Sequence, residues 1–178
     1  MLYIYICIIL QMPFTLFHIG PGVLISLLLS RYVNSISLLI STVFIDIEPL
    51  LHMIIYGYIV HGFLHTIPGA VLFGLVVGYL YYISRSYLSK IRKLFPWCHR
   101  DTLSSCLAGG VIGSLLHVFL DAPLYRDLQL LPLIDNPLYH TYDLFSLLFS
   151  YYTTLMLPLI YAVYFTYVKI KKRRSDKS

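Results

Sequence analysis

The sequence predicts an all-α protein, a bundle of about five membrane-spanning helices that occupies the whole chain as one domain. Hydrophobic residues make up 58% of its 178 residues, charged residues only 12%, and the mean hydropathy is +0.77. A soluble domain carries about 25% charged residues, so this chain needs an apolar surrounding. Disulfides and zinc-finger sites are not expected, because no metal-ligand spacing occurs among Cys7, Cys98 and Cys106.

Five stretches are apolar and long enough to cross about 30 Å of hydrocarbon, which takes roughly 20 helical residues. They comprise residues 13–30, 37–56, 66–84, 102–120 and 144–168. Residues 121–143 contain several prolines, too many for one helix, and are predicted to form a structured outer loop. Residues 1–11 are apolar but lack the basic start of a signal peptide. Either Met12 begins the first span, or residues 1–11 extend that span outward.

The basic residues predict the orientation of the chain in the plasma or inner membrane. Cytoplasmic loops of membrane proteins carry an excess of Lys and Arg. With the N-terminus outside and the C-terminus inside, twelve of the thirteen basic residues face the cytoplasm, and Arg126 is the exception. They lie at Arg31, in the connection 85–100 and in the tail 169–178. Such a tail is typical of a topology anchor that contacts anionic lipids, so no nucleic-acid partner is expected.

Ionisable side chains within the spans are the main functional signal. A charged group at mid-bilayer costs roughly 2.5–3.5 kcal/mol, so such groups persist when they are paired, metal-bound or hydrated. They gather towards the outer ends of the spans: His18, Asp46, Glu48, His52, His61, His65, His117 and Asp121. At 1.5 Å rise per residue, all lie within roughly 15 Å of the outer surface. This sorting by depth predicts one site built from several helices.

The spacing of these residues favours a metal site. Three pairs are four residues apart, which places both members on one helical face, as in zinc-binding helices. The pairs are Glu48 with His52, His61 with His65, and His117 with Asp121. Imidazole and carboxylate ligands suit zinc, manganese or iron, so we expect one or two divalent ions, with zinc first. The expected ligands are His18, Asp46, His52, His61, His65, His117 and Asp121.

Pro49 is expected to interrupt the second span. It cannot donate a backbone hydrogen bond to Ile45, and a break there would aim both Asp46 and Glu48 inward. On its position, Glu48 is the expected general base.

A lone buried His or Asp is more often a hydrogen-bonded packing residue than a ligand, so the shared depth and the paired spacing carry the prediction. Ordinary solvated residues are expected in or beside the outer loop at Asp127, Asp135, His140 and Asp143. His99 is expected to be cytoplasmic and unrelated to the site. Small residues are expected to permit close helix packing at Gly109, Gly110, Gly113 and Ser114.

Four motifs occur in order between His18 and Pro132: Phe-His-Ile-Gly at 17–20, Asp-Ile-Glu-Pro at 46–49, His-Gly-Phe-Leu-His-Thr at 61–66 and His-Val-Phe-Leu-Asp at 117–121. In order and placement they resemble the inner-membrane-associated metal-dependent hydrolases, a family sometimes labelled LexA-binding. The resemblance implies metal-dependent hydrolysis without naming a substrate. The chain departs from the family pattern at Glu48, which replaces an Asp, and at Pro49, which replaces a His. The histidines of the third motif are four residues apart instead of five.

The expected function is hydrolysis of an ester or phosphoester, with a metal-activated water as nucleophile. A site roughly 5–15 Å below the outer surface favours membrane lipids or lipid-linked molecules as substrates. One alternative is a transporter or channel for protons or divalent cations, although the inner halves of the spans carry no acid or histidine. A second is a non-catalytic scaffold that binds a cytoplasmic protein through residues 85–100 or the basic tail.

Overall fold

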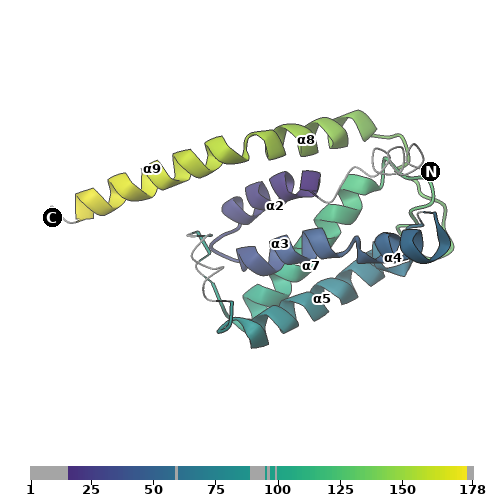
Figure 1. Ribbon diagram of the computed structural model, residues 1–178, viewed down its shortest axis with the longest axis horizontal. Helices are drawn as coiled ribbons and strands as arrows, with labels where there is room; N and C mark the ends of the chain where they lie inside the picture. Colours follow the sequence, from purple (N-terminus) through teal and green to yellow (C-terminus); the bar gives the residue numbers. More distant parts are fainter. Residues whose placement is uncertain (1–15, 59, 89–94, 96, 99, 176–178) are drawn as a thin grey trace.

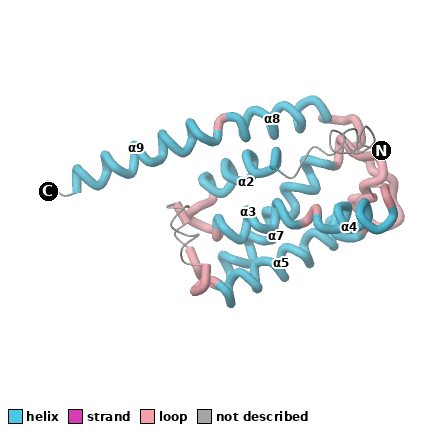
Figure 2. Tube along the Cα trace, in the orientation of Figure 1, coloured by secondary structure: helices cyan, strands magenta, loops and turns pink. Residues whose placement is uncertain are grey.

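Over the residues that the structure describes, the chain is helical with connecting turns, which confirms the predicted all-α class (Figure 2). The computed structural model describes residues 16–58, 60–88, 95, 97–98 and 100–175, without the side chains of 16, 169 and 171–175. Its elements are α2 (Leu16–Leu28), α3 (Ser35–Phe44), α4 (Ile47–Tyr56), the 3-10 helix η1 (Phe63–His65), α5 (Ile67–Ser84), α7 (Leu103–Asp121), α8 (Asp143–Leu155) and α9 (Leu157–Ser175). The predicted start of the first span, His99 and the last tail residues lie outside the described residues.

Three helical segments of the described chain are long and apolar enough to cross a membrane: Ser35–Tyr56, α5 and α7. The pair α8 and α9 adds a fourth if it counts as one span, with a bend of 50° between its two helices. Helix α2 has 13 residues, roughly 20 Å at 1.5 Å per residue, which is short of about 30 Å of hydrocarbon. The five predicted spans are therefore not confirmed: length and composition support three or four.

Helix α7 lies at the centre of the bundle and packs against α5 on one side and α3 on the other. Helix α2 packs against α3 and α8. Figure 1 shows α8 and α9 following one another across the top of the molecule, with α9 extending past the end of the bundle. The same view shows α4, the start of α5 and the end of α7 near one end, on the right.

Small residues allow α7 to approach its neighbours closely, as the sequence predicts. A Cβ atom at Gly110 would collide with the carbonyl oxygen of Gly74 on α5, and one at Gly113 would collide with that of Leu38 on α3. Hydroxyl groups bond across the same contacts: Ser41 donates to the Gly110 carbonyl at 2.6 Å, and Ser114 to the Ala70 carbonyl at 2.7 Å. In an apolar surrounding, such close packing and interhelical hydrogen bonds hold helices together.

The second predicted span is interrupted where Pro49 suggests. Helix α3 ends at Phe44 and α4 begins at Ile47, so that Ile45 and Asp46 lie between them. Proline has no N–H and cannot donate to the carbonyl four residues earlier, while the Leu50 N–H still donates to the Asp46 carbonyl at 3.0 Å. The break places Asp46 inside the bundle.

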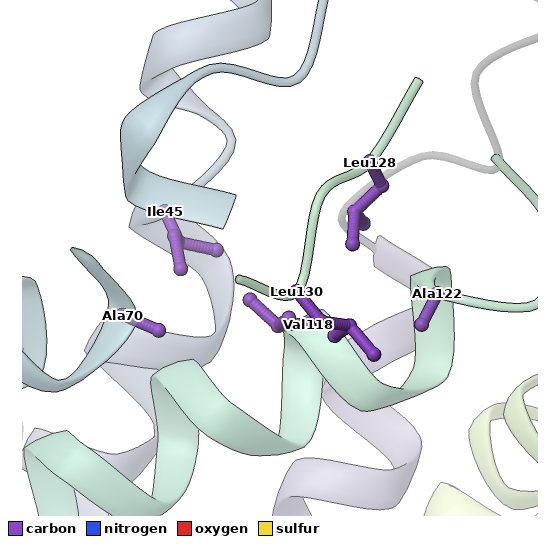
Figure 3. Close-up of a cluster of buried hydrophobic side chains, with 6 residues drawn as sticks. All are labelled: Ile45, Ala70, Val118, Ala122, Leu128 and Leu130. Atoms are coloured by element: carbon purple, nitrogen blue, oxygen red, sulfur yellow. The ribbon is translucent and has the colours of Figure 1, made fainter. Parts of the chain in front are cut away.

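The outer loop folds back over this end of the bundle and is structured, as predicted. Figure 3 shows its buried side chains Leu128 and Leu130 beside Ile45, Ala70 and Val118. The backbone also joins the loop to α5, because the Ile67 N–H donates to the Leu130 carbonyl at 2.8 Å. The loop therefore covers the end of the bundle at which the ionisable residues gather.

Three of the described basic residues lie at the other end of the bundle, whereas Arg126 lies in the outer loop. Arg31 lies in the connection between α2 and α3, and Arg85 and Arg100 lie in the connection between α5 and α7; Figure 1 shows both connections on the left. The Arg100 side chain donates to the Arg31 carbonyl at 3.1 Å. This separation agrees with a basic cytoplasmic face, while the orientation N-out and C-in stays a prediction.

Candidate metal centre

Four of the predicted ligands converge on one point: Asp46, His65, His117 and Asp121. Each offers one ligand atom, and these atoms all lie within 4.8 Å of one another. They come from the break between α3 and α4, from η1 and from the end of α7. His65, His117 and Asp121 are buried, and Asp46 is half-buried. This group could hold a metal ion.

The distances within the group agree with a small coordination sphere. His117 Nε2 lies 2.9 Å from Asp46 Oδ1 and 3.1 Å from Asp121 Oδ2. His65 Nε2 lies 3.5 Å from the same Asp46 oxygen. Zinc–nitrogen distances of about 2.0–2.1 Å place neighbouring tetrahedral ligands roughly 3.3–3.4 Å apart. The observed separations bracket that value.

The group gathers nitrogen and oxygen atoms that lack a full set of well-aligned hydrogen bonds. Among the described residues, the Nε2 atoms of His65 and His117 and the Oδ1 atom of Asp121 are buried and make no hydrogen bond of good geometry, although atoms of the same group or of His18 lie 2.9–3.5 Å from them. Leaving such an atom unpaired costs about 1–3 kcal/mol, so native proteins seldom do so. Buried nitrogens and oxygens gathered this closely fit a bound cation or a shared proton.

Other contacts fix both imidazole rings with Nε2 facing the group. His117 Nδ1 donates to the Thr42 carbonyl at 2.7 Å. His65 Nδ1 lies 3.3 Å from Glu48 Oε2, which also accepts from the Leu64 N–H at 3.0 Å. A carbonyl or carboxylate on the far nitrogen is the usual support of a metal-bound histidine, because it sets the tautomer and the ring orientation. Glu48 therefore has the contacts of a positioning residue.

Gly62 leaves room for the Glu48 carboxylate beside the loop that precedes η1. A Cβ atom at Gly62 would lie 2.5 Å from Glu48 Oε1. A larger residue at this position would therefore displace the Glu48 carboxylate, the end of a flexible side chain, from its place beside the loop.

His18 lies directly beside the group. Its ring stacks on the His117 ring with centroids 4.3 Å apart, and its Nε2 lies 3.0 Å from Asp121 Oδ1. Both ring nitrogens of His18 are buried without a hydrogen-bond partner. The structure thus brings His18 close enough to add a further ligand.

His61 lies next to the group with its Nδ1 already engaged. Asp127 Oδ2 lies 3.0 Å from both the Nδ1 and the backbone N–H of His61. The His61 ring packs against the rings of His65 and Tyr125, at centroid distances of 4.9 and 4.3 Å. Asp127 is exposed, in keeping with the expectation that it is solvated, and its pairing with His61 was not predicted. Nothing in the sequence pointed to the pair, because its members are far apart and Asp127 lies in an irregular loop.

His52 lies outside the group. Its ring packs against the Tyr56 ring, with centroids 5.4 Å apart, while Glu48 on the same helix faces Leu64 and His65. The spacing of four residues therefore does not bring Glu48 and His52 to the same partners. His140 and Asp143 form an exposed pair at 2.9 Å, in keeping with the expectation that they are solvated.

The carboxylates of the candidate metal centre favour a positively charged group, either a proton or a metal ion, beside them. Burial alone would lower the pKa of His65, but the neighbouring carboxylates of Asp46 and Glu48 raise it above its ordinary value. Burial raises the pKa of the Tyr125 phenol, and the charges of Asp121 and Asp46 raise it further. A proton and a metal ion would therefore compete for the same nitrogen of His65.

Comparisons of the chain with protein-family models, with curated proteins and with solved structures found no match. The likeness to the membrane hydrolases therefore stays a prediction from the four motifs, and the candidate metal centre depends on its own geometry.

Proposed function

We propose that this chain is a multi-pass membrane protein that hydrolyses an ester or phosphoester at a divalent metal centre. The proposed ligands are Asp46, His65, His117 and Asp121, with His18 as a further ligand. The observation that carries the proposal is the convergence of the buried Nε2 atoms of His65 and His117 on one Asp46 oxygen, at 3.5 and 2.9 Å. Packing residues would satisfy these nitrogens locally.

Zinc is the proposed metal. The four-residue group offers two imidazole nitrogens and two carboxylate oxygens and no thiolate, a donor set that zinc accepts in tetrahedral geometry. Manganese and iron accept the same donors. A divalent metal held there would supply a water molecule whose pKa is lowered to about 7.

The chain's own residues supply the rest of a hydrolytic site. Glu48 and the Thr42 carbonyl orient the two imidazoles, and the loop residues Leu128 and Leu130 keep bulk water from this end of the bundle. Asp46 is the most exposed of the four ligands, with 21% of its side chain accessible, so a substrate would approach past it. In the reaction, the water oxygen bonds to the acyl carbon or phosphorus, the ester bond breaks, and the leaving oxygen takes up a proton.

The position of the centre supports a substrate from the membrane. Three of the four ligands, His65, His117 and Asp121, lie at or near the ends of α5 and α7, which are long enough to span a membrane, while Asp46 lies at the break within Ser35–Tyr56. The ends of a spanning helix approach the polar boundary of the bilayer. We therefore propose a lipid or lipid-linked substrate. Glu48 as general base stays a prediction, since its carboxylate contacts the Nδ1 side of His65.

The test is the metal content of the full-length protein, purified in detergent after incubation with zinc. We expect about one ion per chain, lost in His65→Ala and in Asp121→Ala. The matched controls His140→Ala and Asp143→Asn change an exposed His–Asp pair and should keep the ion. Normal zinc content in both centre variants would refute the metal site.

Activity is then measured on 4-nitrophenyl esters and on bis(4-nitrophenyl) phosphate. The zinc-loaded wild type should hydrolyse at least one of them, and Asp121→Ala should not. If the protein binds zinc but hydrolyses neither compound, the metal centre stands and the proposal of a hydrolase is refuted.

A further inference from the structure

An apolar groove of about 270 Å³ runs between the α3–α4 segment and α5. Its lining residues are Ile40, Phe44, Ile47, Phe73, Val77, Leu80, Tyr81, Ser84 and Leu88. They repeat at helical spacing along both walls, so that the groove is elongated along the helices.

The groove opens on an exposed, apolar surface of segments that are long enough to span a membrane. Phe44, Ile47 and Leu80 on its walls are 56%, 43% and 53% exposed, and they belong to segments of spanning length. In a bilayer, hydrocarbon is the surrounding solvent along such segments. The groove is therefore open to lipid chains from the side.

One end of the groove lies beside the candidate metal centre. Phe44 and Ile47 line it, and both lie within two residues of Asp46. Asp46 is also the most exposed of the four ligands. A molecule in the groove would therefore end next to the accessible side of the centre.

The length, volume and apolar lining of the groove fit an unbranched hydrocarbon chain. The α5 wall extends from Phe73 to Ser84, eleven steps along the helix and roughly 16 Å at 1.5 Å per step, about half the hydrocarbon thickness. The volume equals roughly nine units of about 30 Å³, the share of one water molecule in the liquid, and a methylene group is of similar size. The described residues that line the groove include no charged group for a headgroup or a peptide.

We propose that this groove binds one acyl chain of a membrane lipid and presents the ester at its end to the metal centre. This inference depends on the proposed function for its ester, and it narrows the substrate class from lipids in general to lipids with a long, unbranched acyl chain. The chain binds by packing along α5, and Asp46 marks the place of the bond to be cleaved.

The experiment uses the full-length protein in phosphatidylcholine nanodiscs that contain a phosphatidylcholine with a diazirine in its acyl chain. After illumination, mass spectrometry locates the adducts. We expect adducts on groove residues such as Val77 and Leu80 in preference to Leu72 on the same helix. Leu72 and Leu80 are equally exposed, at 54% and 53%, and only Leu80 lines the groove.

Two matched variants make the test decisive. Leu80→Trp should reduce the adducts on the other groove residues at least about fivefold, the lower bound for overfilling an apolar site, and Leu72→Trp should not. The rate ratio of 4-nitrophenyl dodecanoate to 4-nitrophenyl butyrate should fall in Leu80→Trp only.

Equal adduct yields in the two variants would overturn the proposal, as would adducts spread evenly around α5. Cross-links that instead show residues 1–15 or a second copy of the chain in the groove would also overturn it. The zinc content, measured in the same samples, separates the two proposals: acyl-chain adducts without bound zinc would refute the metal centre alone.

Discussion

Replacing Glu48 tests whether this carboxylate positions His65 or takes a proton from water. Its Oε2 contacts His65 Nδ1 at 3.3 Å and accepts from the Leu64 N–H at 3.0 Å. Glu48→Ala removes both contacts, so that the His65 ring can turn and change tautomer. Glu48→Gln keeps a carbonyl oxygen for both donors and removes only the charge.

The expected magnitude follows from these contacts. Removing such a support of a metal-bound histidine lowers metal affinity about 10- to 100-fold, which corresponds to about 1.4–2.7 kcal/mol. The contact with His65 is longer than the about 2.7–2.9 Å of a strong charge-assisted hydrogen bond. We therefore expect the lower end, about tenfold for Glu48→Ala, and a smaller loss for Glu48→Gln.

The assay is competition for zinc between the detergent-purified protein and a chromophoric chelator at constant pH. Thermal melting of each variant in the presence of zinc serves as the control for folding. A folded Glu48→Ala protein with the affinity of the wild type would refute the positioning role. Glu48→Gln with unchanged affinity and no turnover would establish the general base instead.

Three further predictions concern stability. Removing zinc with a chelator should lower the melting temperature, because an ion at 100 times its dissociation constant stabilises the folded state by about 2.7 kcal/mol; an unchanged melting temperature would contradict the metal centre. Gly110→Val should destabilise the bundle by about 1–3 kcal/mol, since a Cβ atom there meets the Gly74 carbonyl, whereas Leu72→Val on an exposed face should melt close to the wild type. Burial alone would raise the pKa of Asp127, but the hydrogen bonds from His61 hold it at about 2, below the ordinary value of 3.8. The contribution of Asp127 to stability is therefore fully present above pH 3.8 and lost as the pH falls through about 2. The difference in melting temperature between wild type and Asp127→Asn should be constant from pH 8 to 5 and shrink progressively below pH 4; an undiminished difference at pH 2.5 would contradict this pairing.

The helices of the bundle core could be predicted closely from the sequence. Predicted spans at 66–84 and 102–120 correspond to α5, Ile67–Ser84, and α7, Leu103–Asp121. The interruption near Pro49 and the close packing at Gly110 and Gly113 were also predictable, because both follow from the chemistry of single residues. The number of spans was not, because an apolar stretch such as residues 13–30 does not reveal where its helix ends.

The candidate centre could be predicted in part. Shared depth and spacing pointed to the four residues that converge and also to His52, which packs on Tyr56 instead. Spacing assigns residues to a helical face only while the helix stays regular, and the break at Ile45–Asp46 changes which way α4 faces. The contact between His61 and Asp127 depends on a loop of irregular backbone, where spacing says nothing about direction.

By itself, the sequence determined that the chain is helical and apolar, and that its acids and histidines gather towards one end of its helices. These properties depend on composition and on distance along the chain. Only the tertiary structure decided which nitrogen of each ring faces the centre, that Glu48 contacts His65, and that a groove lies between the α3–α4 segment and α5. Each of these depends on the direction of a side chain relative to residues far away in sequence, which packing sets and local pattern does not.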